Sequence, residues 1–238
     1  MSSAINRTVD FSKGAANIAL TAHIEPTCIA TSLKWTSTCM ASTQARIPIE
    51  VSPLPAVMAK YIMTDKHWFM ENILCYLSNA VKYSSGGKIT VSLALEEREE
   101  AAVDTPEKKN VVVKKDFVSE LLSLKNNSVI DNFSSSSYTD DKKSVQMLCV
   151  SVEDEGIGVD SSQVSGLFKP FQQTMRMAGG TGLGLYSLAK RVEVLKGRYG
   201  VSGRTDGRPG SRFWFSIPYS PDEVYTIEQL NEESMARE

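Results

Sequence analysis

A glycine-rich stretch constrains this chain more than any other feature. It reads Gly179-Gly180-Thr181-Gly182-Leu183-Gly184-Leu185 and runs directly into a segment with helical periodicity over residues 185–196. Glycine can adopt positive φ and lets a ligand approach the backbone, and the free N–H groups at the start of a helix favour anions. The stretch therefore predicts a phosphate-binding loop at a helix N-terminus. A flexible loop has a similar composition, so the neighbouring motifs have to decide between the two.

Composition and charge exclude several classes of protein. The 238 residues are 42% apolar and 23% charged, and the net charge of -2 leaves no global basic field for nucleic acid. No apolar run approaches the ~20 residues that cross a bilayer, and no secretory signal is visible. The four cysteines lack CxxC spacing and are expected to be buried, reduced thiols. We therefore expect a cytoplasmic (intracellular) chain with no nucleic-acid partner and no membrane segment.

The best predicted helix spans residues 65–84 and has two faces. Asp65 stands where an N-cap is favoured. The apolar core face repeats every 3.6 residues and consists of Met70, Ile73, Leu74, Leu77, Ala80 and Val81. A second face, built from residues three and four apart, consists of Cys75, Asn79, Lys82 and Tyr83. A polar face is usually only solvated, but Asn79 is a poor helix former at mid-helix with no capping role, which suggests a function.

The most apolar predicted strand, residues 145–152, runs directly into Glu153-Asp154-Glu155-Gly156-Ile157-Gly158. A carboxylate at the end of a buried strand can lie at the bottom of a pocket, and the two glycines let the backbone turn with no side chain in the way. A loop-like segment, residues 159–178, follows and contains Phe168-Lys169-Pro170-Phe171. Alternating apolar residues predict further strands over residues 47–51, 88–95, 198–204 and 211–218.

In this order the motifs resemble the catalytic, ATP-binding domain of sensor histidine kinases, which shares an ATPase family with gyrase, Hsp90 and MutL. The resemblance covers about residues 47–218 apart from an insertion. It implies a two-layer α/β sandwich, with helices on one face of a mixed β-sheet and a mobile ATP lid over residues 159–180. It also implies that ATP and Mg²⁺ are bound.

The resemblance assigns roles to single residues. Asp154 would accept a hydrogen bond from the adenine amino group, and Asn79 would offer an amide oxygen to Mg²⁺. Lys82 would offset phosphate charge, the ring of Tyr83 would pack on the base, and Lys169 or Arg176 of the lid would reach the terminal phosphate. The expected ATP-binding residues are Asn79, Lys82, Tyr83, Asp154, Gly156, Ile157, Gly158, Arg176, Gly180, Thr181, Gly182, Leu183, Gly184 and Leu185. Phe168 and Phe171 are expected to anchor the lid to the core.

The predicted organisation has three parts. Residues 1–45 are the remnant of the second helix of a dimerisation hairpin, with a connecting strand and loop. Residues 46–219 form the ATP-binding catalytic domain, interrupted by a flexible, charged and serine-rich insertion at about residues 96–144 that includes a short helix at 114–125. Residues 220–238 form a polar C-terminal tail.

The sequence departs from the family in ways that affect function. The histidine that accepts phosphate in histidine kinases has no counterpart, since His67 reads as a surface residue at a helix start and His23 lacks the surrounding motif. Cys75 stands one turn before Asn79, where relatives carry a polar or acidic residue, and a thiol is a poor general base. Glu71, a further turn away, would have to reach further. No catalytic residue is therefore assigned.

Three functional hypotheses remain. The leading one is a histidine protein kinase domain that binds Mg-ATP and transfers its γ-phosphoryl group to a histidine on a separate dimerisation domain, in a two-component phosphorelay that ends on a response-regulator receiver. The alternative is a degenerate, non-catalytic ATP-binding module that controls partner binding. An ATPase clamp of the gyrase or Hsp90 kind is disfavoured, because the glutamate that serves as base there is absent.

Overall fold

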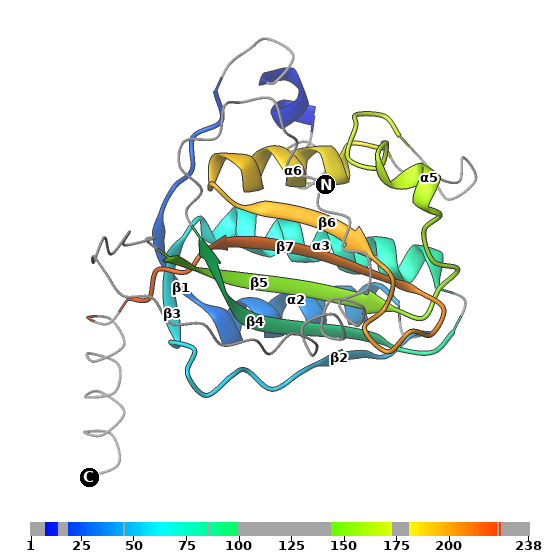
Figure 1. Cartoon of the computed structure of the whole chain (residues 1–238), viewed down its shortest axis with the longest axis horizontal. Helices are drawn as coiled ribbons and strands as arrows, with labels where there is room; N and C mark the ends of the chain where they lie inside the picture. Colours follow the sequence, from blue (N-terminus) through cyan, green and yellow to red (C-terminus); the bar gives the residue numbers. More distant parts are fainter. Residues whose placement is uncertain are drawn as a thin grey trace, which may run out of the picture.

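A five-stranded mixed β-sheet organises the described part of the chain, which comprises residues 8–13, 19–44, 46–84, 86–99, 144–172, 181–222 and 224 (Figure 1). In this computed structural model the strands lie in the order β2-β4-β5-β7-β6. Their bounds are Ile49–Val51, Ile89–Glu99, Ser144–Asp154, Ser211–Pro218 and Arg198–Ser202, in that order. β2 is parallel to β4, and the other neighbours are antiparallel. The apolar strand predicted near residues 145–152 is therefore the central one, buried between two neighbours.

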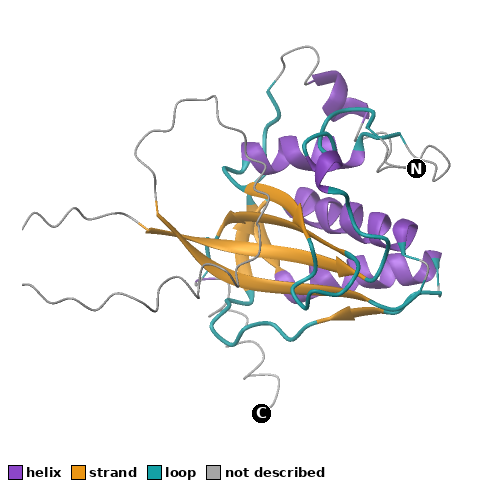
Figure 2. Ribbon diagram, turned by 45° about the vertical axis from the view of Figure 1, so that its right-hand side comes forward, coloured by secondary structure: helices purple, strands orange, loops and turns teal. Residues whose placement is uncertain are grey.

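Helices cover one face of this sheet, which confirms the predicted two-layer α/β sandwich (Figure 2). They are α2 (Ile29–Thr43), α3 (Lys66–Tyr83), the short α5 (Ser161–Val164) and α6 (Gly184–Val194). A separate two-stranded sheet pairs β1 (Glu25–Cys28) with β3 (Tyr61–Thr64). The core lies where α3 meets β7: the ring centroids of Phe69 and Tyr76 are 6.1 and 6.0 Å from that of Phe215.

The predicted helix near residues 65–84 is confirmed as α3. Its N-cap is Asp65, which accepts the N–H groups of Trp68 and His23 at 2.9 Å each. Ile73, Leu77 and Ala80 of the predicted core face are buried. Cys75 was expected on the polar face, but it is 5% exposed and belongs to the core. The reason is that α3 packs against α2, α6 and the sheet together, so its buried arc is wider than one stripe.

The threonine- and serine-rich segment after β1, residues 29–43, is a helix, so the connecting loop expected within residues 1–45 is wrong for this segment. Serine and threonine are poor helix formers because their hydroxyls compete for backbone groups. Here the hydroxyls bond within the helix instead, as when Ser32 donates to the Cys28 carbonyl at 2.9 Å. Ile29 and Leu33 are buried where α2 meets α3, and this tertiary packing overrides the local propensity.

The ladder between β4 and β5 is longer than predicted. β4 continues through the charged run to Glu99, which pairs with Ser144 at the start of β5. An antiparallel ladder holds these polar residues in a strand because their backbone groups are paired whatever the side chains are. The remainder of the predicted insertion, with the short helix predicted at 114–125, lies outside the described residues.

The predictions for the two ends of the chain had different outcomes. Residues 8–13 are helical, in agreement with the predicted end of a helix. The predicted polar tail begins with residues that belong to the fold, since the Met63 N–H donates to the Ser220 carbonyl at 2.8 Å and the Asp222 N–H to the Tyr61 carbonyl at 3.0 Å. Residues 225–238 lie outside the described part.

α6 ends two residues earlier than its periodicity predicts. Lys196 adopts a φ of 58°, and the Gly197 N–H closes the last turn on the Val192 carbonyl at 2.8 Å. Glycine follows because a Cβ at position 197 would lie 2.1 Å from the Ser216 carbonyl oxygen on β7. The close approach of the chain to β7 therefore sets where the helix stops.

Candidate functional site

Asp154 lies at the end of the central strand and is buried, 2% exposed. Its Oδ1 accepts the Gly156 N–H at 2.8 Å, and the backbone of Ser211 provides a second hydrogen bond. Burial raises the pKa of the Asp154 carboxyl above its usual value, and these two backbone hydrogen bonds oppose part of the rise. The result is a fixed, partly desolvated acceptor, which suits recognition of an amino group.

The turn after Asp154 lies directly against the end of α3. A Cβ at Gly156 would lie 2.5 Å from the Tyr83 carbonyl oxygen and 2.7 Å from Asp154 Oδ1, so only glycine fits. Gly158 adopts a φ of 77°, which favours glycine for a different reason. Ile157 between them is 68% exposed, at the rim of the turn. Two motifs about seventy residues apart in the sequence are thus in contact.

Asn79 and Lys82 lie on the more exposed side of α3. Asn79 is half-buried, and its amide makes no hydrogen bond to any described residue. Lys82 is exposed, with its ammonium 5.9 Å from the centre of the half-buried Tyr83 ring. A free amide oxygen fits Mg²⁺, which takes few protein ligands and keeps several waters. In the parts of the chain that the structure describes, no three metal-ligating residues cluster, so Asn79 would hold the metal together with phosphate and water.

The glycine stretch is described from Thr181 onward, while Arg176 and Gly180 lie outside the described residues. Thr181 is exposed, and its hydroxyl accepts the Leu183 N–H at 3.3 Å. Gly182 adopts a φ of 68°, as the predicted turn requires. Gly184 opens α6, Leu183 is 4% exposed, and the half-buried Leu185 packs on the core. The stretch therefore leads into a helix N-terminus, as predicted.

The predicted lid segment is anchored at one of the two expected positions. Phe168 is 7% exposed, and its ring centroid lies 4.6 Å from that of Tyr199 on β6, which confirms its core role. Phe171 is 60% exposed, and its ring meets Phe11 of the N-terminal helical residues at 4.8 Å, so its expected core role is wrong. The Phe171 N–H donates to the Gly182 carbonyl at 3.0 Å, which joins this segment to the glycine stretch. Lys169 is exposed.

The topology brings these motifs to one end of the sheet. β5 ends at Asp154, beside Ser211 at the start of β7. α6 leads back into β6, and β6 ends beside the start of β7, so Gly184 lies at this same end (Figure 1). The end of α3 joins them through the contact with Gly156. A buried carboxylate, the C-terminal end of α3 and the N-terminus of α6 therefore lie at one end of the sheet.

Sequence reasoning missed the ionic partner of Glu71. Its carboxylate is 7% exposed and lies 2.7 Å from the Arg191 guanidinium of α6, which also pairs at 2.7 Å with Asp10 of the N-terminal helical residues. Glu71 is therefore engaged in an ion pair two turns of α3 before Asn79. No local pattern links the three residues, so no sequence signal predicts this network. His67, 57% exposed, is the surface residue expected.

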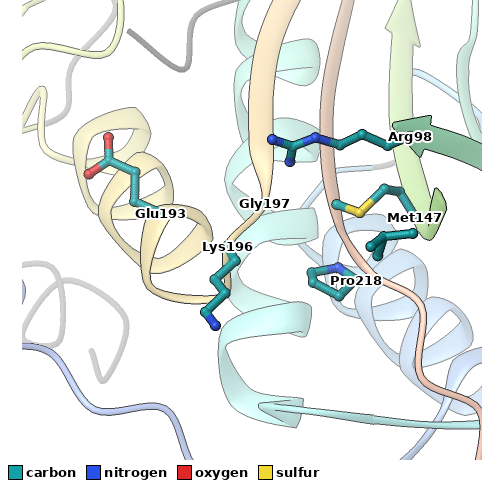
Figure 3. Close-up of a pocket in the computed structure, with 7 residues that line it drawn as sticks. Arg98, Met147, Glu193, Lys196, Gly197 and Pro218 are labelled. Carbon is teal, nitrogen blue, oxygen red and sulfur yellow. The ribbon is translucent and has the colours of Figure 1, made fainter. Parts of the chain in front are cut away.

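A cavity of about 340 Å³ lies at the opposite end of the sheet, away from the predicted motifs (Figure 3). It is lined by Arg98, Val145, Met147, Glu193, Lys196, Gly197 and Pro218. Met147 and Asp154 are seven residues apart on β5, which places the cavity ~23 Å from the carboxylate. It is therefore not part of the candidate site.

No helix among the described residues is long and apolar enough to cross a membrane.

The fold is shared with solved histidine kinase structures. Full-length ShkA, crystallised in complex with AMPPNP, superposes with a TM-score of 0.60 and 20% identity over 92% of this chain and 36% of that chain. The Acinetobacter baumannii histidine kinase AdeS superposes with a TM-score of 0.53 and 18% identity over 92% of this chain and 77% of that one. These likenesses concern the architecture alone.

Sequence comparison finds similarity to one ATPase family and to histidine kinases. Residues 124–221 match the family described as histidine kinase-, DNA gyrase B-, and HSP90-like ATPase. The hybrid signal transduction histidine kinase K of Dictyostelium discoideum is 28% identical over 174 residues, 71% of this chain and 11% of that protein. The autoinducer 2 sensor kinase/phosphatase LuxQ of Vibrio vulnificus is 29% identical over 164 residues, 67% of this chain and 14% of that protein. These findings support an ATP-binding catalytic domain of the histidine kinase type in this chain, which spans a small part of these relatives' length.

Proposed function

We propose that this chain binds Mg-ATP and transfers the γ-phosphoryl group to a histidine on a separate dimerisation domain, within a two-component phosphorelay. The observation that carries the proposal is Asp154, a buried carboxylate at the strand end with two backbone hydrogen bonds that fix it. A fixed acceptor pairs with the amino group of adenine and rejects the carbonyl that guanine has at the same position. The family match and the histidine kinase relatives support the same reading.

In this proposal the residues of the site divide between the base and the phosphates of ATP. Asp154 selects adenine, and Gly156 and Gly158 leave room for the base beside Tyr83. Mg²⁺, when bound at Asn79, neutralises and orients the phosphate oxygens. Lys82 adds positive charge at the phosphates. The amides of the glycine stretch, Thr181 to Leu185, and the N-terminus of α6 receive the remaining phosphate oxygens.

The chemical step itself needs little from the protein besides positioning. A neutral nitrogen of the acceptor histidine forms a bond to the γ-phosphorus while the bond from that phosphorus to the β–γ bridging oxygen breaks, and ADP leaves with the electron pair. The acceptor and the receiver come from other domains, as the words "hybrid" and "sensor" in the relatives' names suggest for those proteins. This domain would supply the nucleotide in a fixed orientation.

A second function has a specific observation in its favour. Cys75, one turn before Asn79, is buried in the core, and Glu71 is held by Arg191. The preceding turns of α3 therefore present no free carboxylate beside Asn79 that would act as a base. This favours a non-catalytic module in which bound ATP controls a partner-binding surface.

Calorimetric titration of ATP, with and without Mg²⁺, tests the proposal. We expect saturable binding that Asp154→Ala abolishes, and Asn79→Ala should remove the dependence on Mg²⁺. Glu50→Ala, which removes an exposed carboxylate paired with Lys88 on the far edge of the sheet, is the matched control and should bind as the wild type. Failure to bind at millimolar ATP would contradict both functions.

Transfer of labelled phosphate distinguishes the two candidates. The chain is incubated with labelled ATP and a histidine-bearing hairpin domain from a related kinase. Label on the hairpin supports the kinase, while ATP binding without label supports the non-catalytic module. ATP turnover in the absence of a hairpin would instead point to an ATPase of the gyrase or Hsp90 kind.

A further inference from the structure

We propose that Arg204 is a positioning residue for Asp154, so that the turn between β6 and β7, residues 203–210, determines nucleotide specificity. This inference rests on the proposed function, because it assumes that Asp154 recognises the base. Neither the glycine motifs nor the spacing of the strands indicates a role for this turn. Its contacts with the Asp154 segment indicate one.

Arg204 connects the turn to the backbone that carries Asp154. Its guanidinium donates to the Asp154 carbonyl oxygen at 3.4 Å and pairs with the Glu155 carboxylate at 3.2 Å. Asp206 fixes the guanidinium from the other side with two hydrogen bonds, at 2.9 Å from Nε and 2.6 Å from the second terminal nitrogen. Only 8% of the Arg204 side chain is exposed, so the planar group is held between the two segments.

Other residues of the turn also contact the end of β5. The Thr205 hydroxyl donates to the Glu153 carboxylate at 3.0 Å. Gly210 adopts a φ of 134°, and a Cβ there would lie 2.0 Å from the Asp154 carbonyl oxygen and 2.7 Å from Arg204 Cδ. Glycine at this position thus allows the turn to close directly on Asp154 and the arginine together.

Arg204 contacts the main chain of Asp154 and makes no hydrogen bond to the carboxylate that is proposed to recognise the base. Arg204 bonds the main chain of Asp154, whereas the Asp154 carboxylate is bonded by the N–H of Gly156 and the backbone of Ser211. The arginine therefore sets the position of the strand end, from which the carboxylate projects. A displacement of about 1 Å at such a group is enough to reduce a ligand interaction about tenfold or more. Because adenine and guanine differ in the group that meets the carboxylate, the displacement changes selectivity as well as affinity.

The turn offers a matched control. Arg208 lies in the same turn and has the same charge, but its side chain is 75% exposed and only approaches Asp206, at 3.4 Å. Removing Arg208 changes the net charge near the site as much as removing Arg204 does. Any difference between Arg204→Ala and Arg208→Ala therefore reports the local interactions of Arg204, which include its Coulombic effect on the Asp154 carboxyl, and not the net charge of the turn.

The first experiment measures ATP and GTP affinities by calorimetry for the wild type, Arg204→Ala, Asp206→Asn and Arg208→Ala. We expect Arg204→Ala to weaken ATP binding about tenfold or more while GTP binding changes little, so that the ratio of the two affinities falls by the same factor. Asp206→Asn, which leaves the arginine in place but loosens it, should change the ratio in the same direction. Arg208→Ala should keep the wild-type ratio. A wild-type ratio in both Arg204→Ala and Asp206→Asn overturns the inference.

A second measurement needs no nucleotide and separates this inference from the proposed function. Hydrogen exchange of the Gly156 amide reports how firmly Asp154 Oδ1 holds it. We expect about tenfold faster exchange in Arg204→Ala, with no change at the Ser187 amide, which donates to Leu183 within α6. If the wild type fails to bind ATP, the proposed function is wrong, and faster Gly156 exchange still supports the positioning role. An unchanged exchange rate of the Gly156 amide in Arg204→Ala overturns the positioning role of Arg204.

Discussion

Arg191 is the residue whose loss we expect to destabilise this fold most among its charged groups. Its side chain is 3% exposed on α6, and it pairs with two buried carboxylates, Asp10 at 10% and Glu71 at 7% exposure, both at 2.7 Å. The three groups come from three separate segments. Removing the guanidinium takes the 2.7 Å partner from both carboxylates, while Glu71 keeps its 3.5 Å contact with the exposed His67.

The expected magnitude follows from that arrangement. Breaking a buried ion pair by removing one partner destabilises a protein by about 3–5 kcal/mol, mainly because the remaining charge is left desolvated. Arg191→Met keeps much of the aliphatic stem, so the loss of packing is small. For a chain of this size, about 2–4 °C is lost per kcal/mol, which predicts a fall in Tm of roughly 6–20 °C.

The assay is urea unfolding of Arg191→Met, and a shifted midpoint with an unchanged m value reports the change in stability. Lys190→Met is the matched control: it is the neighbouring residue on α6, and the side chains of its pair with Glu193 are 43% and 31% exposed, so we expect a loss of only about 0–1 kcal/mol. Glu71→Gln in the Arg191→Met background should recover part of the stability, because it removes one of the two buried carboxylates that have lost Arg191. The reasoning is refuted if Arg191→Met lowers the free energy of unfolding no more than Lys190→Met does. It is also refuted if the loss in the double variant equals the sum of the losses from Arg191→Met and Glu71→Gln.

Three further predictions concern the site and the core. Gly156→Ala should abolish ATP binding, because the new Cβ would meet the Tyr83 carbonyl, while Gly86→Ala, which has open space around it, should bind normally in the same titration. Asp154→Asn should be more stable than the wild type at neutral pH: burial raises the folded-state pKa of Asp154, so the wild type loses stability as pH rises through that pKa. Unfolding free energies measured from pH 4 to 8 should show a gap that widens with pH, and a constant gap would contradict the assignment. Tyr76→Phe should lose about 0.5–1.5 kcal/mol in urea unfolding, because the buried hydroxyl donates to a β7 carbonyl at 2.9 Å; no loss would mean that this bond adds nothing.

Local patterns were sufficient for the elements that carry the site. Asp65 caps α3 because an aspartate before a 3.6-residue apolar repeat satisfies the first free N–H groups, a short-range effect. The continuous apolar run before Asp154 predicted a central strand because only a strand with neighbours on both sides buries every residue. The glycines of both turns were readable because positive φ and close backbone approach restrict those positions to one residue type.

Other features depended on partners that are distant in sequence. Residues 29–43 form a helix against their own propensity because α3 covers Ile29 and Leu33. Cys75 lies in the core because neighbouring elements surround α3.

The motifs of this domain, their order and the helix and strand that carry them were predictable from local patterns, since capping, periodicity and glycine geometry act within a few residues. The contacts by which Arg191 joins Asp10 to Glu71, and Arg204 holds the strand end of Asp154, became visible only in the folded chain. An arginine has the same appearance in a sequence whether it is solvated or buried between two segments. Its partners are chosen by the packing of the chain, and no local pattern records that choice.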